Sequence, residues 1–189
     1  MTKELLLAVC LLPAVFMLHD FEDIVLMQPW LINNSSRIKA RFPRLAKHIN
    51  HASARSTAAF ALAVAEEFIL ICLVTALSVW YSTYGVWVAV YCAFFLHLLL
   101  HIGQSIVLKS YIPALATSIL SLPYCVWVGL LLVRWGQFDL WQTGLLFALG
   151  SVLVAANLLL ALKTADWFDK QLAKYAACAI STGEQKRNR

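Results

Sequence analysis

The chain has 189 residues, of which 61% are hydrophobic and only 13% are charged. Because a soluble domain carries about 25% charged residues, this chain has too few polar side chains to cover a water-soluble surface. Its net charge of +5 does not indicate nucleic-acid binding, because the basic residues flank hydrophobic runs, as they do in membrane proteins. The composition therefore predicts a single-domain, all-α integral membrane protein with no nucleic-acid partner.

Hydrophobic runs predict about five transmembrane helices, each near the roughly 20 residues that cross the hydrocarbon core. Tryptophan or tyrosine lies near several of their ends, as expected at the two membrane interfaces. The predicted spans of this bundle are 5–30, 57–80, 85–108, 111–135 and 140–162.

Basic residues gather in two polar segments. The loop 33–56 holds six of them and no acidic residue, and the tail 163–189 holds six more. If both segments are cytoplasmic, Lys109 also falls on that side, so 13 of the 15 Lys and Arg residues are cytoplasmic, as the positive-inside rule requires. The charge distribution thus predicts an outer N-terminus and a cytoplasmic C-terminus. We expect a multi-pass protein of the bacterial inner (plasma) membrane.

Apolar residues recur at helical spacing inside this basic loop. Part of the loop is therefore either a basic amphipathic helix on the membrane surface or a solvated cytoplasmic connection. The residues that carry the pattern are Ile38, Phe42, Leu45 and Ile49.

Ionisable residues lie inside three of the predicted spans, where five of the ten acidic residues and three of the five histidines are found. An unpaired charge at the bilayer centre costs about 2.5–3.5 kcal/mol on insertion scales. These groups therefore need pairing, protonation or a bound ligand. They are His19, Asp20, Glu22, Asp23, Glu66, Glu67, His97 and His101.

Helical spacing predicts that many of these groups converge. His19, Glu22 and Asp23 share one helical face, and His97 and His101 share another. Counted with the rise of about 1.5 Å per residue, these groups and the two glutamates of the second span fall at one depth. That depth is near the bilayer midplane, on its cytoplasmic side, and we expect one common site there.

A metal site is the first hypothesis, because imidazoles and carboxylates are the ligands that hold one or two zinc, iron or manganese ions. The other interpretations are a metal-free proton relay or polar binding site, and structural pairing of the side chains. The expected metal ligands are His19, Glu22, Asp23, Glu67, His97 and His101. The expected catalytic groups are Asp23, Glu66 and Glu67. We expect Asp20 and Gln104 to contact the ligands without binding the metal themselves.

The motif His19-Asp20-Phe21-Glu22-Asp23, followed by Pro29-Trp30, resembles the signature of the HXXEE-domain family of small integral membrane proteins. Further similar stretches are Glu66-Glu67, the run from His97 through His101 to Gln104-Ser105-Ile106, Tyr111-Ile112-Pro113 and Thr117-Ser118. Asp23 stands where the family name has a second glutamate. The side chain of aspartate is one methylene shorter than that of glutamate, so its carboxylate lies closer to the backbone. The resemblance covers nearly all the spans and implies a shared site rather than a particular reaction.

The leading functional hypothesis is a membrane-embedded, metal-dependent enzyme acting on a lipid or isoprenoid-like small molecule. A metal-ion or proton transporter or channel is the second, because histidines and carboxylates also line such pathways. Haem binding through two histidines at matched depth, such as His19 and His97, is the third. A CAAX-type intramembrane protease is excluded, because its EExxxR motif would require arginine where Ile71 stands.

Overall fold

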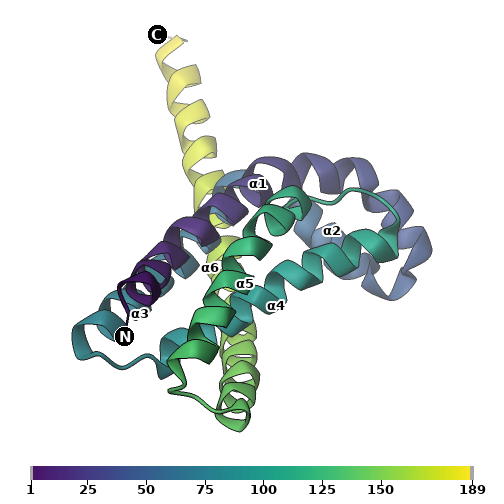
Figure 1. The fold of residues 1–189 in the computed structure, drawn as a ribbon. Coiled ribbons are helices and arrows are strands. Elements are labelled where there is room, and N and C mark those ends of the chain that lie inside the picture. Colours follow the sequence, from purple (N-terminus) through teal and green to yellow (C-terminus); the bar gives the residue numbers. More distant parts are fainter. Residues whose placement is uncertain (1, 188–189) are drawn as a thin grey trace.

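The computed structural model describes the backbone of residues 2–187 and the side chains of residues 2–176. Every element in this part of the chain is helical, and five of the helices are long and apolar enough to cross a membrane. The elements are α1 (Lys3–Arg41), η1 (Pro43–Leu45), α2 (Ala46–Ala54), α3 (Thr57–Tyr81), α4 (Gly85–Leu108), α5 (Leu115–Trp135) and α6 (Leu140–Arg187) (Figure 1). The predicted all-α bundle of five long apolar helices is confirmed, and its orientation in the membrane stays a prediction.

Local caps explain where several helices begin and end. The Thr2 side chain accepts a hydrogen bond from the Leu5 backbone N–H at 3.2 Å, and the Ser56 side chain accepts one from Ala59 at 3.1 Å. Such side-chain oxygens satisfy the free N–H groups of a first helical turn. At the other end of α5, Gly136 adopts φ 66°, the left-handed conformation that commonly stops a helix.

The last helix, α6, continues past the predicted end at residue 162 to Arg187. Two prolines account for the other main differences from the predicted spans. α1 continues through Pro29 to Arg41, well past the predicted end near residue 30. It stops at Phe42, because a residue that precedes proline disfavours the helical conformation, and Pro43 follows. α5 begins at Leu115 rather than at residue 111, because Pro113 lies in a turn that precedes the helix.

The basic loop forms a helical hairpin rather than an irregular connection. The end of α1 turns through η1 into α2, and α2 packs back against α1. Ile38 on α1 and Ile49 on α2 are both buried there beside Leu31. The apolar residues of the loop therefore meet across a turn instead of lining one continuous helix. Whether this hairpin lies on a membrane surface stays a prediction.

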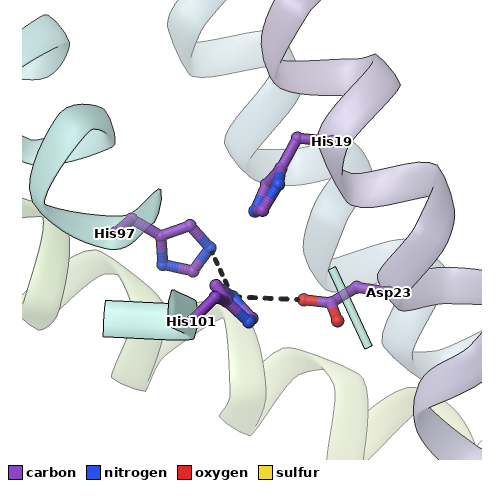
Figure 2. Close-up of side chains that lie close together, drawn as sticks. All are labelled: His19, Asp23, His97 and His101. Carbon is purple, nitrogen blue, oxygen red and sulfur yellow. Dashed lines mark hydrogen bonds and ion pairs between the residues drawn. The ribbon is translucent and has the colours of Figure 1, made fainter. Parts of the chain in front are cut away.

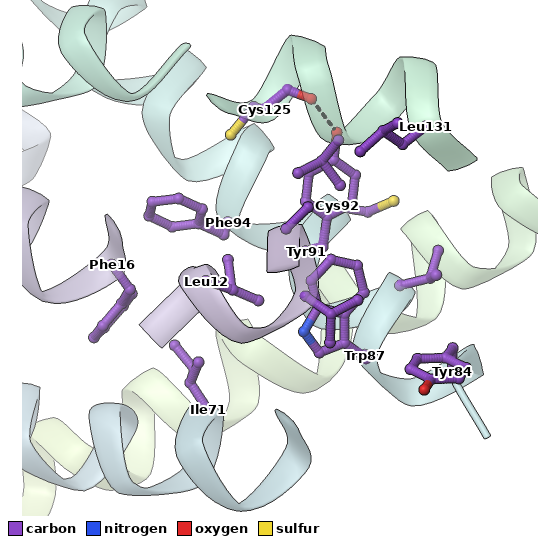
Figure 3. Close-up of a cluster of buried hydrophobic side chains, with 14 of the residues drawn as sticks. Leu12, Phe16, Ile71, Tyr84, Trp87, Tyr91, Cys92, Phe94, Cys125 and Leu131 are labelled. Carbon is purple, nitrogen blue, oxygen red and sulfur yellow. Dashed lines mark hydrogen bonds between the residues drawn. The ribbon is translucent and has the colours of Figure 1, made fainter. Parts of the chain in front are cut away.

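The main apolar core joins α4 to α1, α3 and α5 (Figure 3). Trp87 is fully buried, and its ring stacks on that of Tyr91 with a centroid separation of 5.6 Å. The Tyr91 hydroxyl donates a hydrogen bond to the Cys125 carbonyl at 2.6 Å, which ties α4 to α5. This packing fixes the position of α4, and the two histidines of α4 lie further along the same helix.

Small residues let α6 approach the rest of the bundle closely. A Cβ added to Gly150 would lie only 2.1 Å from the carbonyl oxygen of Ala89, so α6 touches the backbone of α4. A cluster of buried alanines joins α6 to α3 in the same way: Ala59, Ala63, Ala161 and Ala165. Such small-residue contacts are typical of helix packing within membranes.

Apolar side chains also cover much of the exterior. Trp80, Val133 and Leu140 are 82%, 79% and 91% exposed, and many other large hydrophobic side chains share this surface. Soluble monomers rarely expose such continuous apolar area. The exterior is therefore suited to contact with the hydrocarbon chains of a membrane.

Candidate metal centre

Four of the predicted ligands meet between α1 and α4. His19 and Asp23 come from α1, and His97 and His101 come from α4. One ligand atom from each residue lies within 4.8 Å of all the others. Figure 2 shows the three imidazole rings turned toward one another, with the carboxylate of Asp23 beside His101. Ligand atoms lie about 2.0–2.2 Å from a zinc ion, so the four atoms would have to move closer together to bind one ion.

The tautomer of His101 is fixed by its contacts. Its Nδ1 lies 3.2 Å from the carbonyl oxygen of Pro113, in the turn before α5. A carbonyl only accepts hydrogen bonds, so Nδ1 carries the proton. When the ring is neutral, Nε2 carries the lone pair, and this atom lies 3.1 Å from His97 Nε2 and 3.6 Å from Asp23 Oδ2.

His19 is held in the same tautomer by a threonine. Its Nδ1 lies 3.3 Å from the hydroxyl of Thr117. That hydroxyl has one proton, and its shortest contact is to a carboxylate oxygen of Glu22 at 2.6 Å. The hydroxyl therefore donates to Glu22 and accepts from Nδ1–H of His19. His19 Nε2 is left with a lone pair directed into the site.

Two atoms of the cluster are buried without a hydrogen-bond partner, His19 Nε2 and Asp23 Oδ1. Buried polar atoms in folded proteins nearly always have a partner, so each exception needs an explanation. One of these atoms offers a neutral lone pair and the other a carboxylate lone pair. Both are types of atom that bind divalent metals, and they belong to two of the four grouped residues.

Among residues 2–176, no lysine or arginine forms an ion pair with the acidic residues of the cluster. Within the described side chains, Asp20 and Asp23 have only histidines as ion-pair partners, at 3.8 Å from His19 and 3.6 Å from His101. Since a charge inside a bilayer is costly, these carboxylates require protons or a cation. The distance from Asp20 to His19 is too long for a hydrogen bond, and Asp20 is not one of the four grouped residues, although the atom it approaches is His19 Nε2.

Glu22 lies next to the four-residue group but binds elsewhere. One of its oxygens accepts a hydrogen bond from the Tyr111 hydroxyl, and the other accepts the Thr117 backbone N–H at 2.8 Å as well as the Thr117 hydroxyl. Thr117 lies in the first turn of α5, which has no side-chain cap of its own. The carboxylate of Glu22 supplies that cap and sits at the positive end of the helix dipole. Asp23 is one position further around α1 and faces α4 instead.

The two glutamates of α3 lie outside the group of four. An oxygen of Glu66 accepts a hydrogen bond from Asn157 Nδ2 at 3.1 Å, which joins α3 to α6. Glu67 keeps one buried oxygen, Oε1, without a partner. Their expected catalytic roles, and that of Glu67 as a ligand, stay predictions.

The sequence pattern assigned no role to Tyr111, Pro113 and Thr117, which hold Glu22, His101 and His19. The available signal was the resemblance of Tyr111-Ile112-Pro113 and Thr117-Ser118 to the family, at the start of the predicted span 111–135. Neither feature identifies which side chains of another helix will dock there.

An apolar groove with a volume of about 540 Å³ opens beside the cluster. Its lining comes from α1, η1, α2 and α4 and includes Trp30, Phe42 and Leu45. His101 also lines it, so this histidine belongs to both the groove and the ligand group. Gln104, one turn further along α4, lines the groove and is exposed.

Residues 10–128 match the family model described as a protein of unknown function with HXXEE motif. The match covers more than half of the chain and includes both histidines of α4 and the first turn of α5. The chain belongs to the HXXEE family. Its residues His19, Glu22 and Asp23 read H-x-x-E-D, which differs from the family motif only at the last position. No curated protein and no solved structure matches this HXXEE protein.

Proposed function

We propose that this HXXEE protein is a membrane-embedded, metal-dependent enzyme whose His19, Asp23, His97 and His101 bind one divalent transition metal. The observation that supports it most is the pair of buried, unpartnered ligand atoms on His19 and Asp23. Two of the imidazoles are also held by contacts at Nδ1, which leaves His19 Nε2 without a partner and His101 Nε2 with only His97 Nε2 as a hydrogen-bond partner, at 3.1 Å. This is the arrangement in which metal-binding histidines donate their other ring N–H to a carbonyl or to a hydrogen-bonded side chain.

The ligand set favours zinc, iron or manganese. Imidazole nitrogen and carboxylate oxygen are common ligands of these ions, whereas a site of thiolates would favour copper(I) or an iron–sulfur cluster. The cluster contains no cysteine. A bound ion of this kind polarises a substrate oxygen or activates a water molecule. The proposed proton acceptor is Glu67, which keeps a free buried oxygen, whereas Glu66 is engaged by Asn157.

The proposed substrate is a lipid or another apolar molecule within the bilayer, because the groove that reaches His101 is lined mainly by hydrocarbon side chains. Pockets that bind small molecules are commonly apolar, with a few polar groups that fix the reacting end. The proposed location is the bacterial inner membrane with the basic segments in the cytoplasm, as the charge distribution predicts.

The geometry favours one ion over a haem. An axially ligated porphyrin must lie between its two imidazoles, yet the rings of His19 and His97 have centroids only 5.2 Å apart and meet edge to face. His101 packs against both rings, with centroid separations of 5.2 Å to His19 and 4.6 Å to His97. Because the three imidazole rings contact one another, no space is left between His19 and His97 for a porphyrin.

Elemental analysis of the protein purified in detergent tests the proposal. We expect about one equivalent of zinc, iron or manganese per chain, and its loss in the folded double variant His97→Ala/His101→Ala. His48→Ala, an exposed histidine on α2, is the matched control and should retain the metal. Absence of stoichiometric metal in the wild-type protein, even after reconstitution, would overturn the proposal. Metal flux across proteoliposomes that depends on the same histidines would assign the site to transport instead.

A further inference from the structure

The groove beside His101 has the dimensions of a ligand site. Its volume of about 540 Å³ lies within the range of about 300–1,000 Å³ that is typical of small-molecule pockets. The only side chains with strongly polar groups in its lining are those of His101 and Gln104. The groove lies between the hairpin of α1, η1 and α2 on one side and the last turns of α4 on the other.

The hairpin that forms one side of this groove carries several basic residues, of which Arg41 lies next to the lining. The Arg41 guanidinium carbon lies 5.7 Å from the ring centre of Phe42, and Phe42 lines the groove. Arg37 donates a hydrogen bond to the Ser110 hydroxyl at 2.8 Å, so its partner is a neutral group. Within the described side chains, no carboxylate forms an ion pair with any of the basic residues Arg37, Lys39, Arg41, Arg44 and Lys47.

We propose that this groove binds a lipid that has a single hydrocarbon chain and an anionic head group. The head group lies at Arg41, and the chain runs along the groove toward His101. This inference rests on the proposed function in that it names the class of substrate for that metal site. The volume fits one chain, and the unmatched positive charge at the rim fits an anion.

The charge of the head group, rather than burial of the hydrocarbon chain, should make the groove prefer an anionic lipid over an uncharged molecule with the same chain. In a bilayer the hydrocarbon tail leaves one apolar surrounding for another, so the hydrophobic effect adds little to binding within the groove. A basic side chain near the membrane surface contributes about 1 kcal/mol toward an anionic head group. A molecule with the same chain and no charge should therefore bind more weakly.

Binding of two tritiated probes to the protein in phosphatidylcholine nanodiscs tests this inference. Dodecyl phosphate and dodecanol share one chain and differ in the anionic head group. We expect saturable binding of about one dodecyl phosphate per chain and weaker binding of dodecanol. Arg41→Gln should weaken dodecyl phosphate binding about fivefold, which corresponds to about 1 kcal/mol, and leave dodecanol binding unchanged. Lys170→Gln, an exposed lysine on α6, is the charge-matched control.

Two pairs of variants test the groove itself. A Cβ added to Gly103 or to Gly144 meets nothing within 4 Å, but only Gly103 lines the groove. Gly103→Phe should weaken dodecyl phosphate binding about tenfold or more, equivalent to about 1.4 kcal/mol, whereas Gly144→Phe should have no effect. Val107→Trp and Ile106→Trp form a second pair, since both residues are exposed on α4 and only Val107 lines the groove. If Gly103→Phe does not fold, the comparison of Val107→Trp with Ile106→Trp tests whether the probe binds in the groove.

The two proposals can fail separately. Equal binding of dodecyl phosphate by both members of each pair, or equal binding of dodecanol and dodecyl phosphate, would overturn the inference. If the wild-type chain holds metal and binds no dodecyl phosphate, the lipid inference is wrong and the metal proposal stands. If groove-dependent binding occurs in a chain that never holds metal, the groove is a lipid site and the metal proposal is wrong.

Discussion

Replacing Thr117 with valine tests how the metal site is organised. The Thr117 hydroxyl lies 3.3 Å from His19 Nδ1 and 2.6 Å from a Glu22 oxygen. In Thr117→Val the imidazole loses its only described hydrogen-bond partner at Nδ1, and a buried N–H without a partner costs about 1–3 kcal/mol. The ring then no longer favours a proton on Nδ1, so a proton on Nε2 competes directly with the metal.

Removal of a group that orients a metal ligand typically weakens metal binding about 10–100-fold. For Thr117→Val we expect a loss in this range, or about 1.4–2.7 kcal/mol. The affinity is measured in detergent by competition with a chromophoric chelator, and circular dichroism checks the fold. Thr117→Ser keeps the hydroxyl and should retain most of the affinity.

A second threonine provides a matched control. Thr75 on α3 is buried, and its hydroxyl has no hydrogen-bond partner. Thr75→Val makes the same chemical change away from the site and should leave metal affinity unchanged. Equal affinities for Thr117→Val, Thr117→Ser and the wild type would refute the role assigned to the hydroxyl.

Three further changes have defined consequences. Gly150→Ala should lower the free energy of unfolding by about 1–3 kcal/mol, because the new methyl group meets the Ala89 carbonyl. Thermal unfolding in detergent measures the change. The control Gly144→Ala should be neutral or slightly stabilising, since a methyl group there meets nothing within 4 Å. Asp166→Asn should cost about 1.5–3 kcal/mol, because the Arg55 side chain is 10% exposed and lies 2.7 Å from that carboxylate; an unchanged unfolding midpoint would show that the pair contributes nothing. Chelation of the metal should lower the unfolding midpoint of the wild-type protein, since a ligand present at 1,000 times its Kd stabilises by about 4.1 kcal/mol. Chelation should not affect the double variant His97→Ala/His101→Ala, which we expect to hold no metal.

The sequence predicted those features of the fold and site that depend on neighbouring residues. Long apolar runs predicted the five long helices, since the length of a span follows from the thickness of the bilayer. Helical spacing predicted that His97 and His101 act together, and that His19 and Asp23 share a face. The family resemblance seen in the same motifs was confirmed over residues 10–128.

Docking between helices could not be predicted in this way. Spacing places Glu22 and Asp23 on the same side of α1, and the side chain that meets α4 depends on where α5 begins. The start of α5 is set by the turn at Pro113, and the first turn of the helix then accepts Glu22 as its cap. Glu66 likewise pairs with a residue more than 90 positions later in the chain. A one-dimensional pattern identifies the face of a helix but not the partner of that face.

X-ray absorption at the edge of the bound metal tests most directly whether these four residues form the ligand set. We expect the spectrum of the purified protein to show about three imidazoles and one carboxylate oxygen, with bond lengths of about 2.0–2.2 Å. In His19→Ala, the number of imidazoles should fall by one while the other ligands remain. A spectrum with sulfur ligands, or one that does not change when His19 is removed, would contradict the proposed site.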